Sequence, residues 1–527
     1  MKMYFSYNIS EKKKFKIYII VIASFSIFIN QYFANRGVFP IDSFLIFDAA
    51  YNIISNNHPF KDYWSITGPF LDYIQSFFFL IFGINWFGYV LHASFINMVL
   101  ALFTFYFFFK IGLKKNYAFI YSLGVSVLAY PSIGTPFIDH HAVILSMLGL
   151  YSLSLGILLK KNLFWFLTPI FLIFSFFSKQ IPSVYLLILF IVIISFCLFY
   201  LKSLNQKNFV FAFMGILCSV LLISSVFFIN NIPVENFLTQ YIFYPYSLGE
   251  ERMNLLDVDF KNLIGQFKFI YFALIPLVIS TFFLIISKEK NLLKKKELII
   301  SMLFLGSIII FIYYQLLTKN QVLIFFLIPI SAAFSHVYAK KYLKQKYFIH
   351  FVLIIFVVST LKYHSRFNQD KKFTELMNTN LNLAVDASHL DSRLYGLKWI
   401  TPHYPNKPLT EINLLIDAKN ILSTVKARKM IVTDYQFFSS LLKNEFASPN
   451  KWYDERSIPN KINKYYNVHK NFFLDKVNKN KIKHIFFIGK NKNEIFFFQE
   501  LLKENECIVQ KQLNELLLEF DISKCKF

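Results

Sequence analysis

The acidic residues in the hydrophobic two-thirds of this chain avoid its apolar segments and gather in the loops between them. The first loop carries four of them, namely Asp42, Asp48, Asp62 and Asp72. A later loop carries the successive residues Asp139, His140 and His141. Carboxylates at the mouth of a membrane bundle suit acid–base chemistry at the membrane surface better than transport across its middle. We therefore expect a catalytic site at one end of a helical bundle.

Asp42 is the candidate general base, because it is the first acidic residue after an apolar segment. A second interpretation makes Asp42 a helix N-cap, since Asp favours that position and an amphipathic stretch follows over 43–57. The two roles can coexist. Asp62, on the polar side of the same loop, is expected to contact substrate and to affect turnover less than Asp42.

Asp139 is the second catalytic candidate, because it could assist the base, while His140 and His141 could bind a phosphate. The alternative is that all three are interfacial polar residues that cap the next helix. A metal site made from them is a weaker hypothesis, because adjacent histidines diverge on a helix. We therefore predict no metal ligands, and a divalent cation is the only cofactor that the sequence leaves open.

Two basic residues in loops of the same kind are candidates for contact with a substrate phosphate. Lys179 is the only cation in its turn, and Arg252 has the planar fork that suits bidentate phosphate binding. The alternatives are a lysine that snorkels to the membrane surface and an arginine that pairs with Glu250 or Glu251.

The composition indicates a polytopic membrane protein, since 56% of the residues are hydrophobic, 67 are Phe and the mean hydropathy is positive. About eleven segments are apolar and long enough to be read as transmembrane helices: 15–33, 86–109, 117–130, 141–159, 163–178, 182–201, 209–229, 267–287, 298–316, 322–339 and 347–361. The first is expected to be an uncleaved signal anchor. The basic residues that give the net charge of +24 are distributed over the loops between apolar segments, not gathered in a patch typical of nucleic-acid binding. We therefore expect no nucleic-acid partner.

Lysines cluster in alternate loops, and the opposite loops carry few. By the positive-inside rule this bias predicts a cytoplasmic N-terminus. We expect the protein to lie in a bacterial inner (plasma) membrane. The stretch 70–84 is short and is broken by Asp72 and Gln75, so we expect it, like 43–57, to lie on the membrane surface. A hairpin of two helices that crosses the membrane and returns is the alternative.

The chain divides into a transmembrane domain over 1–361 and a C-terminal domain over 362–527. Short apolar runs at 429–433, 482–488 and 516–520 predict buried strands between helices at 411–426 and 492–504, which gives a soluble α/β domain. With about eleven spans before it, this domain is expected outside the cytoplasm. Cys507 and Cys525 both lie in it, and we predict a disulfide bond between them, with two free thiols as the alternative.

The first loop resembles that of GT-C glycosyltransferases, in the branch of protein O-mannosyltransferases, aminoarabinose transferases and lipopolysaccharide-sugar transferases. The resemblance is carried by 42–51, from Asp42 to Tyr51, by 57–63, and by Gly68-Pro69 and Phe82-Gly83, and it extends over about residues 1–360. The family often has a second acidic residue beside the first, whereas Asp42 is followed by Ser43.

The resemblance implies an inverting transfer of a hexosyl or pentosyl unit from a polyprenyl-phosphate donor. The acceptor would be a hydroxyl group of an envelope glycan, lipid or protein on the extracytoplasmic side, with membrane lipid as a further partner. The alternative function is a membrane transporter or flippase for lipid-linked envelope glycans, which would need polar or broken helices at the bilayer centre.

Overall fold

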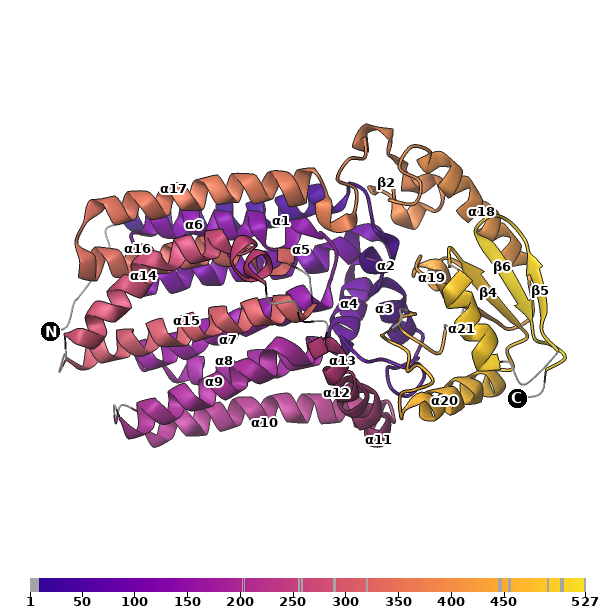
Figure 1. Cartoon of the computed structure of the whole chain (residues 1–527), viewed down its shortest axis with the longest axis horizontal. Helices are drawn as coiled ribbons and strands as arrows, with labels where there is room; N and C mark the ends of the chain where they lie inside the picture. The colour runs from indigo at the N-terminus through magenta and orange to yellow at the C-terminus, as the bar shows by residue number, and fades with distance from the viewer. Residues whose placement is uncertain are drawn as a thin grey trace.

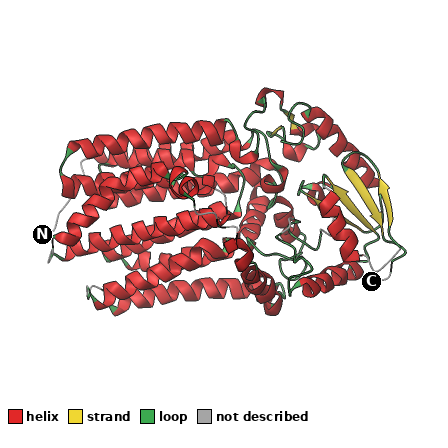
Figure 2. Ribbon diagram, viewed as in Figure 1, coloured by secondary structure: helices red, strands yellow, loops and turns green. Residues whose placement is uncertain are grey.

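The computed structural model describes residues 9–527 except 201, 203, 255, 257–258, 288–290, 319–320, 444–447, 454–455, 491, 503–506 and 526–527; for 9–12, 250–252, 321–322, 492–494 and 496–497 it describes the backbone alone. Long helices run side by side and form a bundle, and a smaller part that contains the sheet covers one end of it (Figures 1 and 2). The N-terminus lies at the opposite end of the bundle. We call the covered end the capped end.

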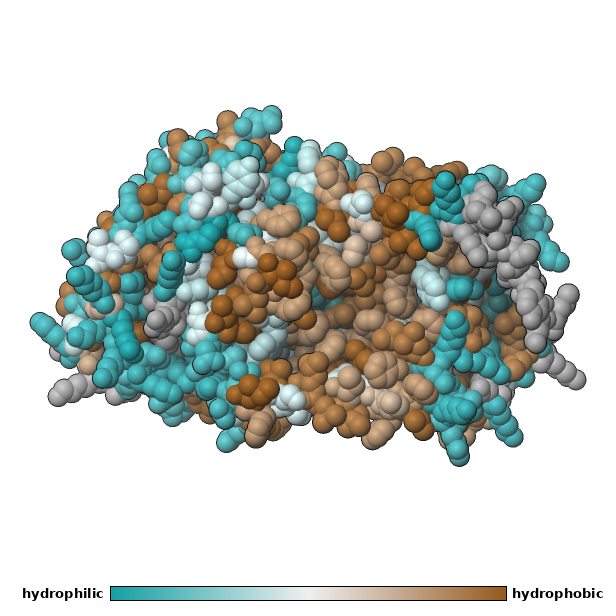
Figure 3. Space-filling model, turned by 180° about the vertical axis from the view of Figure 1, so that it is seen from behind, coloured by the Kyte–Doolittle hydropathy of each residue, from teal (hydrophilic) through white to brown (hydrophobic). Residues whose placement is uncertain are grey.

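Eight helices in the described part of the chain are long and apolar enough to cross a membrane. They are α1 (Ile9–Ala34), α5 (Trp86–Lys110), α7 (Ile138–Leu159), α9 (Gln180–Phe199), α10 (Gln206–Ile229), α14 (Lys268–Ile286), α15 (Leu292–Thr318) and α17 (Lys346–Tyr363). Apolar side chains cover the bundle in a broad band between polar ends (Figure 3). The prediction of a helical membrane protein is confirmed at this level.

Three further segments predicted to cross the membrane are helices that contain fewer than 18 residues. They are α6 (Lys115–Leu128), α8 (Asn162–Ser178) and α16 (Leu327–Tyr338), with 14, 17 and 12 residues. At about 1.5 Å per residue, each is shorter than the ~30 Å hydrocarbon core of a bilayer. The number of eleven spans therefore stays a prediction.

The first loop forms three helices at the capped end, α2 (Pro40–Ser43), α3 (Phe47–Ile54) and α4 (Pro69–Phe82). The prediction of a helix on the membrane surface over 43–57 is wrong, because α3 is buried from Phe47 to Asn52, its polar side included. The reason is that the C-terminal part covers it: the ring of Phe44 lies 5.9 Å from that of Trp399 and 4.7 Å from that of Phe437.

A glycine fixes the start of α4. Gly68 has φ of +71°, and a Cβ atom there would lie 2.5 Å from Ile138 Cγ2. Only glycine tolerates both the left-handed conformation and this close approach. Its backbone thereby brings the first turn of α4 against α7 and against Lys451 of the C-terminal part.

Short helical turns connect the long helices. They are η1 (Tyr130–Ser132), α11 (Val234–Phe237), η2 (Leu238–Phe243), α12 (Tyr244–Ser247), α13 (Gly249–Asn254), η3 (Lys261–Gly265), η4 (Gln321–Ile324), η5 (Ala339–Leu343), η6 (His364–Gln369) and η7 (Lys372–Thr374). The C-terminal part begins with η8 (Leu381–Leu383), η9 (Ala387–His389), η10 (Ser392–Leu394) and a small antiparallel pair, β1 (Val385–Asp386) with β2 (Lys398–Trp399).

A four-stranded sheet with the order β3-β4-β6-β5 forms the centre of the C-terminal part. Its strands are β3 (Lys429–Thr433), β4 (His484–Ile488), β5 (Val509–Gln512) and β6 (Leu517–Asp521), and only β3 and β4 pair in parallel. The helices around it are α18 (Pro408–Thr424), α19 (Phe438–Leu441), α20 (Tyr466–Lys479) and α21 (Lys492–Leu502). The three predicted strands and both predicted helices are present.

The two faces of the sheet pack against different partners. Met430 and Phe487 belong to a cluster with side chains of α20 and α21, whereas Ile431 and Phe486 belong to a cluster that includes the first loop. Successive strand residues point to opposite faces, so both faces are apolar and the strands appear in the sequence as continuous apolar runs. The second face is what holds the first loop in place.

The predicted disulfide bond between Cys507 and Cys525 is present. It joins the segment before β5 to the segment after β6 and so closes the edge of the sheet.

Candidate functional site

Three polar side chains from different segments of the chain meet at the capped end of the bundle. Asp139 lies in the first turn of α7, where a carboxylate is favoured by the helix dipole, and Lys179 lies between α8 and α9. Lys179 Nζ is 2.5 Å from Asp139 Oδ1, and the Tyr314 hydroxyl of α15 donates to the same oxygen. Only 3% of the Asp139 side chain and 12% of the Lys179 side chain are exposed. The structure thus brings together two of the residues that the sequence singled out.

The side chains of His140 and His141 contact groups outside the Asp139–Lys179 pair, and each has different partners. His140 Nε2 donates to Ala129 O at 2.9 Å, and His140 Nδ1 has no hydrogen-bond partner among the described residues. His141 Nε2 is 2.9 Å from His92 Nε2, and His92 Nδ1 donates to Gln75 Oε1 at 3.0 Å. The expectation that the two histidines diverge is confirmed. The described residues contain no group of three or more side chains placed to hold a metal ion.

The other candidates from the sequence take separate positions. Asp42 is half-buried within α2, whose N-cap is Phe39, so the N-cap prediction for Asp42 is wrong. Asp62 accepts a hydrogen bond from the backbone N–H of His58 at 2.9 Å and closes a turn of the first loop. Arg252 lies on α13, and its side chain is outside the part that the structure describes.

Asp48 is a buried carboxylate, although it lies in the amphipathic stretch that we expected on the membrane surface. Its two oxygens accept hydrogen bonds of 3.2 Å from the backbone N–H groups of Ser439 and Ser440 in the C-terminal part. Burial raises the pKa of Asp48 to about 7, although these hydrogen bonds and Arg393 act in the opposite direction. A carboxylate with a pKa near neutrality is suited to accept or donate a proton.

Asp72 and Lys451 form a second buried contact between the first loop and the C-terminal part. Lys451 Nζ is 2.6 Å from Asp72 Oδ1 and also donates to Thr67 O at 3.0 Å, and the Tyr63 hydroxyl donates to Asp72 Oδ2 at 3.2 Å. The Asp72 side chain has no exposed surface. Burial raises the pKa of Asp72 to about 6, because desolvation outweighs the attraction of Lys451. Sequence alone gave no signal for this pair, since its members are 379 positions apart.

An apolar groove lies beside the C-terminal end of α8, the helix that directly precedes Lys179 in the sequence. Its volume is about 490 Å³, and its walls come from α8, α10 and α11 and the segment between the last two. The lining residues are Phe177, Ile223, Ser224, Phe227, Phe228, Asn231, Ile232, Val234 and Phe237. A second apolar cavity shares Phe177, Ile223, Phe227 and Ile232 with it and reaches Pro69 and Phe70 at the start of α4. An apolar surface therefore runs from the side of the bundle to the capped end.

Comparison of the chain with models of known protein families finds no match, and comparison with curated proteins finds none either. The resemblance to GT-C glycosyltransferases therefore stays a prediction that rests on the residues of the first loop.

Proposed function

We propose that this protein is a glycosyltransferase that moves a sugar from a polyprenyl-phosphate donor to a hydroxyl group of an envelope acceptor. The observation that carries the proposal is the Asp139–Lys179–Tyr314 cluster, in which Lys179 directly follows α8, the helix whose Phe177 lines an apolar groove. A lipid-linked sugar phosphate needs both features, an apolar wall for its chain and a cation for its phosphate, at the boundary between membrane and water.

In this proposal the isoprenoid chain lies along the wall formed by Phe177 and its neighbours, and Lys179 faces the phosphate. A carboxylate takes the proton of the acceptor hydroxyl while the oxygen attacks the anomeric carbon from the side opposite the phosphate. The bond between the anomeric carbon and the phosphate oxygen breaks, and Lys179 stabilises the negative charge that the phosphate retains. Asp42 is the proposed base. Asp139 holds Lys179 and is the second candidate for the base.

The proposal includes eleven spans, with α6, α8 and α16 crossing beside the eight long helices, and a C-terminal part on the extracytoplasmic side. The lysine distribution supports this orientation. A reporter enzyme fused after residue 527 should be active only outside the cytoplasm. Activity on the cytoplasmic side would contradict both the span number and the position of the site.

The function can be tested with two matched lysine variants. Lys179→Met removes the cation at the capped end, and Lys341→Met removes the cation of a similar pair, Lys341 with Glu297 at 2.7 Å, at the opposite end. Native mass spectrometry with undecaprenyl phosphate as the probe should show at least about tenfold weaker binding for Lys179→Met only, which corresponds to ~1.4 kcal/mol. Equal binding by the two variants would remove Lys179 from the donor site.

The activity itself is tested by analysis of envelope glycans and lipid-linked sugars in a deletion strain. Loss of one sugar from an envelope glycan, with its lipid-linked form retained or accumulated, is the expected result. It should be restored by the wild-type gene and not by the gene for Asp42→Asn. An unchanged glycan profile in the deletion strain would contradict the proposal.

Transport of lipid-linked glycans is the second candidate. It is favoured by the buried pair of His92 and His141, because ionisable side chains inside membrane-spanning helices often mark ion or substrate paths. A transporter would leave the glycosyl linkage intact, so a deletion strain would accumulate the complete lipid-linked glycan on the cytoplasmic side.

A further inference from the structure

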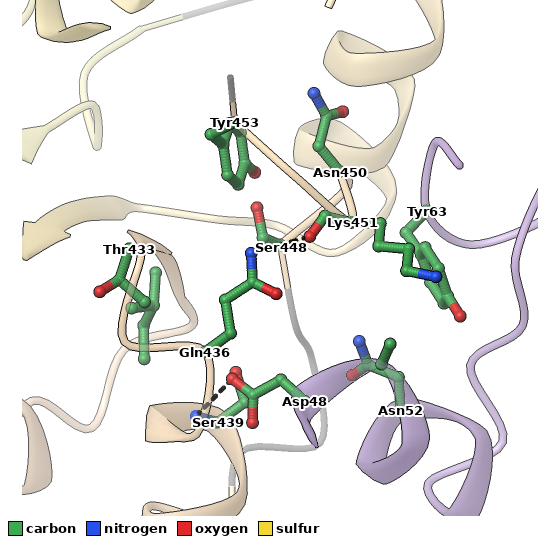
Figure 4. Close-up of a pocket in the computed structure, with 12 residues that line it drawn as sticks. Asp48, Asn52, Tyr63, Thr433, Gln436, Ser439, Ser448, Asn450, Lys451 and Tyr453 are labelled. Atoms are coloured by element: carbon green, nitrogen blue, oxygen red, sulfur yellow. Dashed lines mark hydrogen bonds between the residues drawn. The ribbon is translucent and has the colours of Figure 1, made fainter. Parts of the chain in front are cut away.

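A polar cavity lies between the first loop and the C-terminal part. Asp48 and Asn52 of α3 form one side, and residues of the segments 431–439 and 448–453 form the other (Figure 4). Lys451 and Tyr63, which both contact Asp72 of α4, also line the cavity. The cavity thus has one wall from each part of the protein.

Four polar atoms of residues that line this cavity have no hydrogen-bond partner within the described part of the chain. They are Asn52 Oδ1, Ser448 Oγ, Asn450 Nδ2 and the Tyr453 hydroxyl. Asn52 is 6% exposed and Asn450 is 5% exposed. A buried polar atom without a partner typically costs about 1–3 kcal/mol. Four such atoms around one cavity therefore indicate that a polar molecule occupies it.

The charges on the walls restrict the kind of molecule. Both oxygens of Asp48 already accept backbone N–H groups, and the ammonium group of Lys451 is paired with Asp72. An anion would meet Asp48 with no unpaired cation in the described walls, and a hard metal ion would find only one carboxylate. The unpartnered atoms comprise an acceptor, a donor and two hydroxyls, which together match the donor and acceptor character of hydroxyl groups.

The dimensions of the cavity suit part of a sugar ring. The empty space of the cavity, including its open mouth, is about 370 Å³. Within this space, about 30 Å³ is accessible to the centres of water-sized atoms. The inner space is therefore large enough for at least one water-sized group such as a hydroxyl. The rest of a ring would lie in the mouth.

We propose that this cavity binds the edge of a saccharide, through hydroxyl groups that bond Asn52, Ser448 and Asn450. The identification of this saccharide as the acceptor rests on the proposed function, whereas the binding site itself does not. The C-terminal part then supplies half of the acceptor site rather than only covering the bundle.

The test uses Asn52→Leu, which replaces the unpartnered amide by an apolar side chain of similar volume. The control is Asn382→Leu, at an exposed position of the C-terminal part. Saturation-transfer NMR on the full-length protein in detergent would use methyl glycosides of glucose, galactose, mannose and N-acetylglucosamine as probes. We expect binding of at least one probe by the wild type and by Asn382→Leu, and at least about tenfold weaker binding by Asn52→Leu. The melting temperature of Asn52→Leu without sugar should not fall, because no protein hydrogen bond to Asn52 Oδ1 is lost.

The outcomes separate this proposal from the proposed function. If no probe binds, or if Asn52→Leu binds as well as the wild type, the cavity holds ordered water only and the proposal is overturned. If the probe binds and depends on Asn52 while the deletion strain keeps an unchanged glycan profile, the saccharide site stands and the glycosyltransferase function fails.

Discussion

Removal of the Lys451 ammonium group should weaken the attachment of the C-terminal part to the first loop far more than removal of any exposed lysine. Lys451→Met keeps the length of the side chain and leaves the Asp72 carboxylate buried, with Tyr63 as its one remaining side-chain donor among the described residues. Removal of one partner from a buried ion pair typically costs about 3–5 kcal/mol, because the remaining group stays desolvated. In a unit of about 150–250 residues each kcal/mol shifts the melting temperature by about 2–4 °C, so we expect a decrease of about 10 °C.

The assay is thermal unfolding followed by intrinsic fluorescence, since Trp64 and Trp452 lie at this contact. The control is Lys461→Met, because Lys461 pairs with Glu500 at 2.7 Å but is 55% exposed. Exposed ion pairs contribute little to stability, so Lys461→Met should melt at nearly the wild-type temperature.

A double variant measures the contact itself. Asp72→Asn in the Lys451→Met background removes the isolated charge and should recover more than half of the lost stability. The reasoning is wrong if Lys451→Met melts no earlier than Lys461→Met, or if adding Asp72→Asn lowers the melting temperature further.

Three other predictions concern single groups. The pKa of Asp48 is raised to about 7, so the folded state holds its proton where the unfolded state has lost it; stability should fall as the pH rises from about 4 to about 7, and Asp48→Asn should flatten this slope in unfolding experiments. Asp42→Asn should lower turnover by a factor of roughly 10² or more with donor binding unchanged, and near-normal turnover together with an inactive Asp139→Asn would move the base to α7. Reduction of the Cys507–Cys525 bond, which closes a loop of 18 positions, should destabilise the C-terminal part by about 3 kcal/mol, and equal melting of reduced and oxidised protein would contradict this.

The sequence predicted those features that depend on neighbouring residues. The strand at 429–433 was visible because both faces of the sheet are apolar, and the long helices were visible because their apolar runs exceed 18 residues. The disulfide bond was predictable because both cysteines fall in one short segment. The prediction for α3 failed because an amphipathic pattern does not tell what covers the polar side of a helix. In α3 this side faces hydrogen-bond donors of the C-terminal part instead of water.

The candidate site was predicted only in part for the same reason. Asp139 and Lys179 attracted attention through their positions in loops, and the structure shows that they pair. Asp48 lies in an amphipathic stretch and Asp72 breaks an apolar run, and neither pattern indicated burial. Their burial depends on residues more than 370 positions later in the chain, which no local pattern can show.

The separation between Asp72 and Lys451 has a consequence for the synthesis of the protein. A ribosome adds about 5–20 residues per second, so Lys451 emerges about 20 to 80 s after Asp72. For most of that interval the first loop is present without the segment 399–451 that buries Phe44, Asp48 and Asp72, and the bundle is complete before its capped end is. Until then, another molecule must shield this loop in the nascent chain. A chain that stops before residue 451 should be recognised as incomplete and degraded.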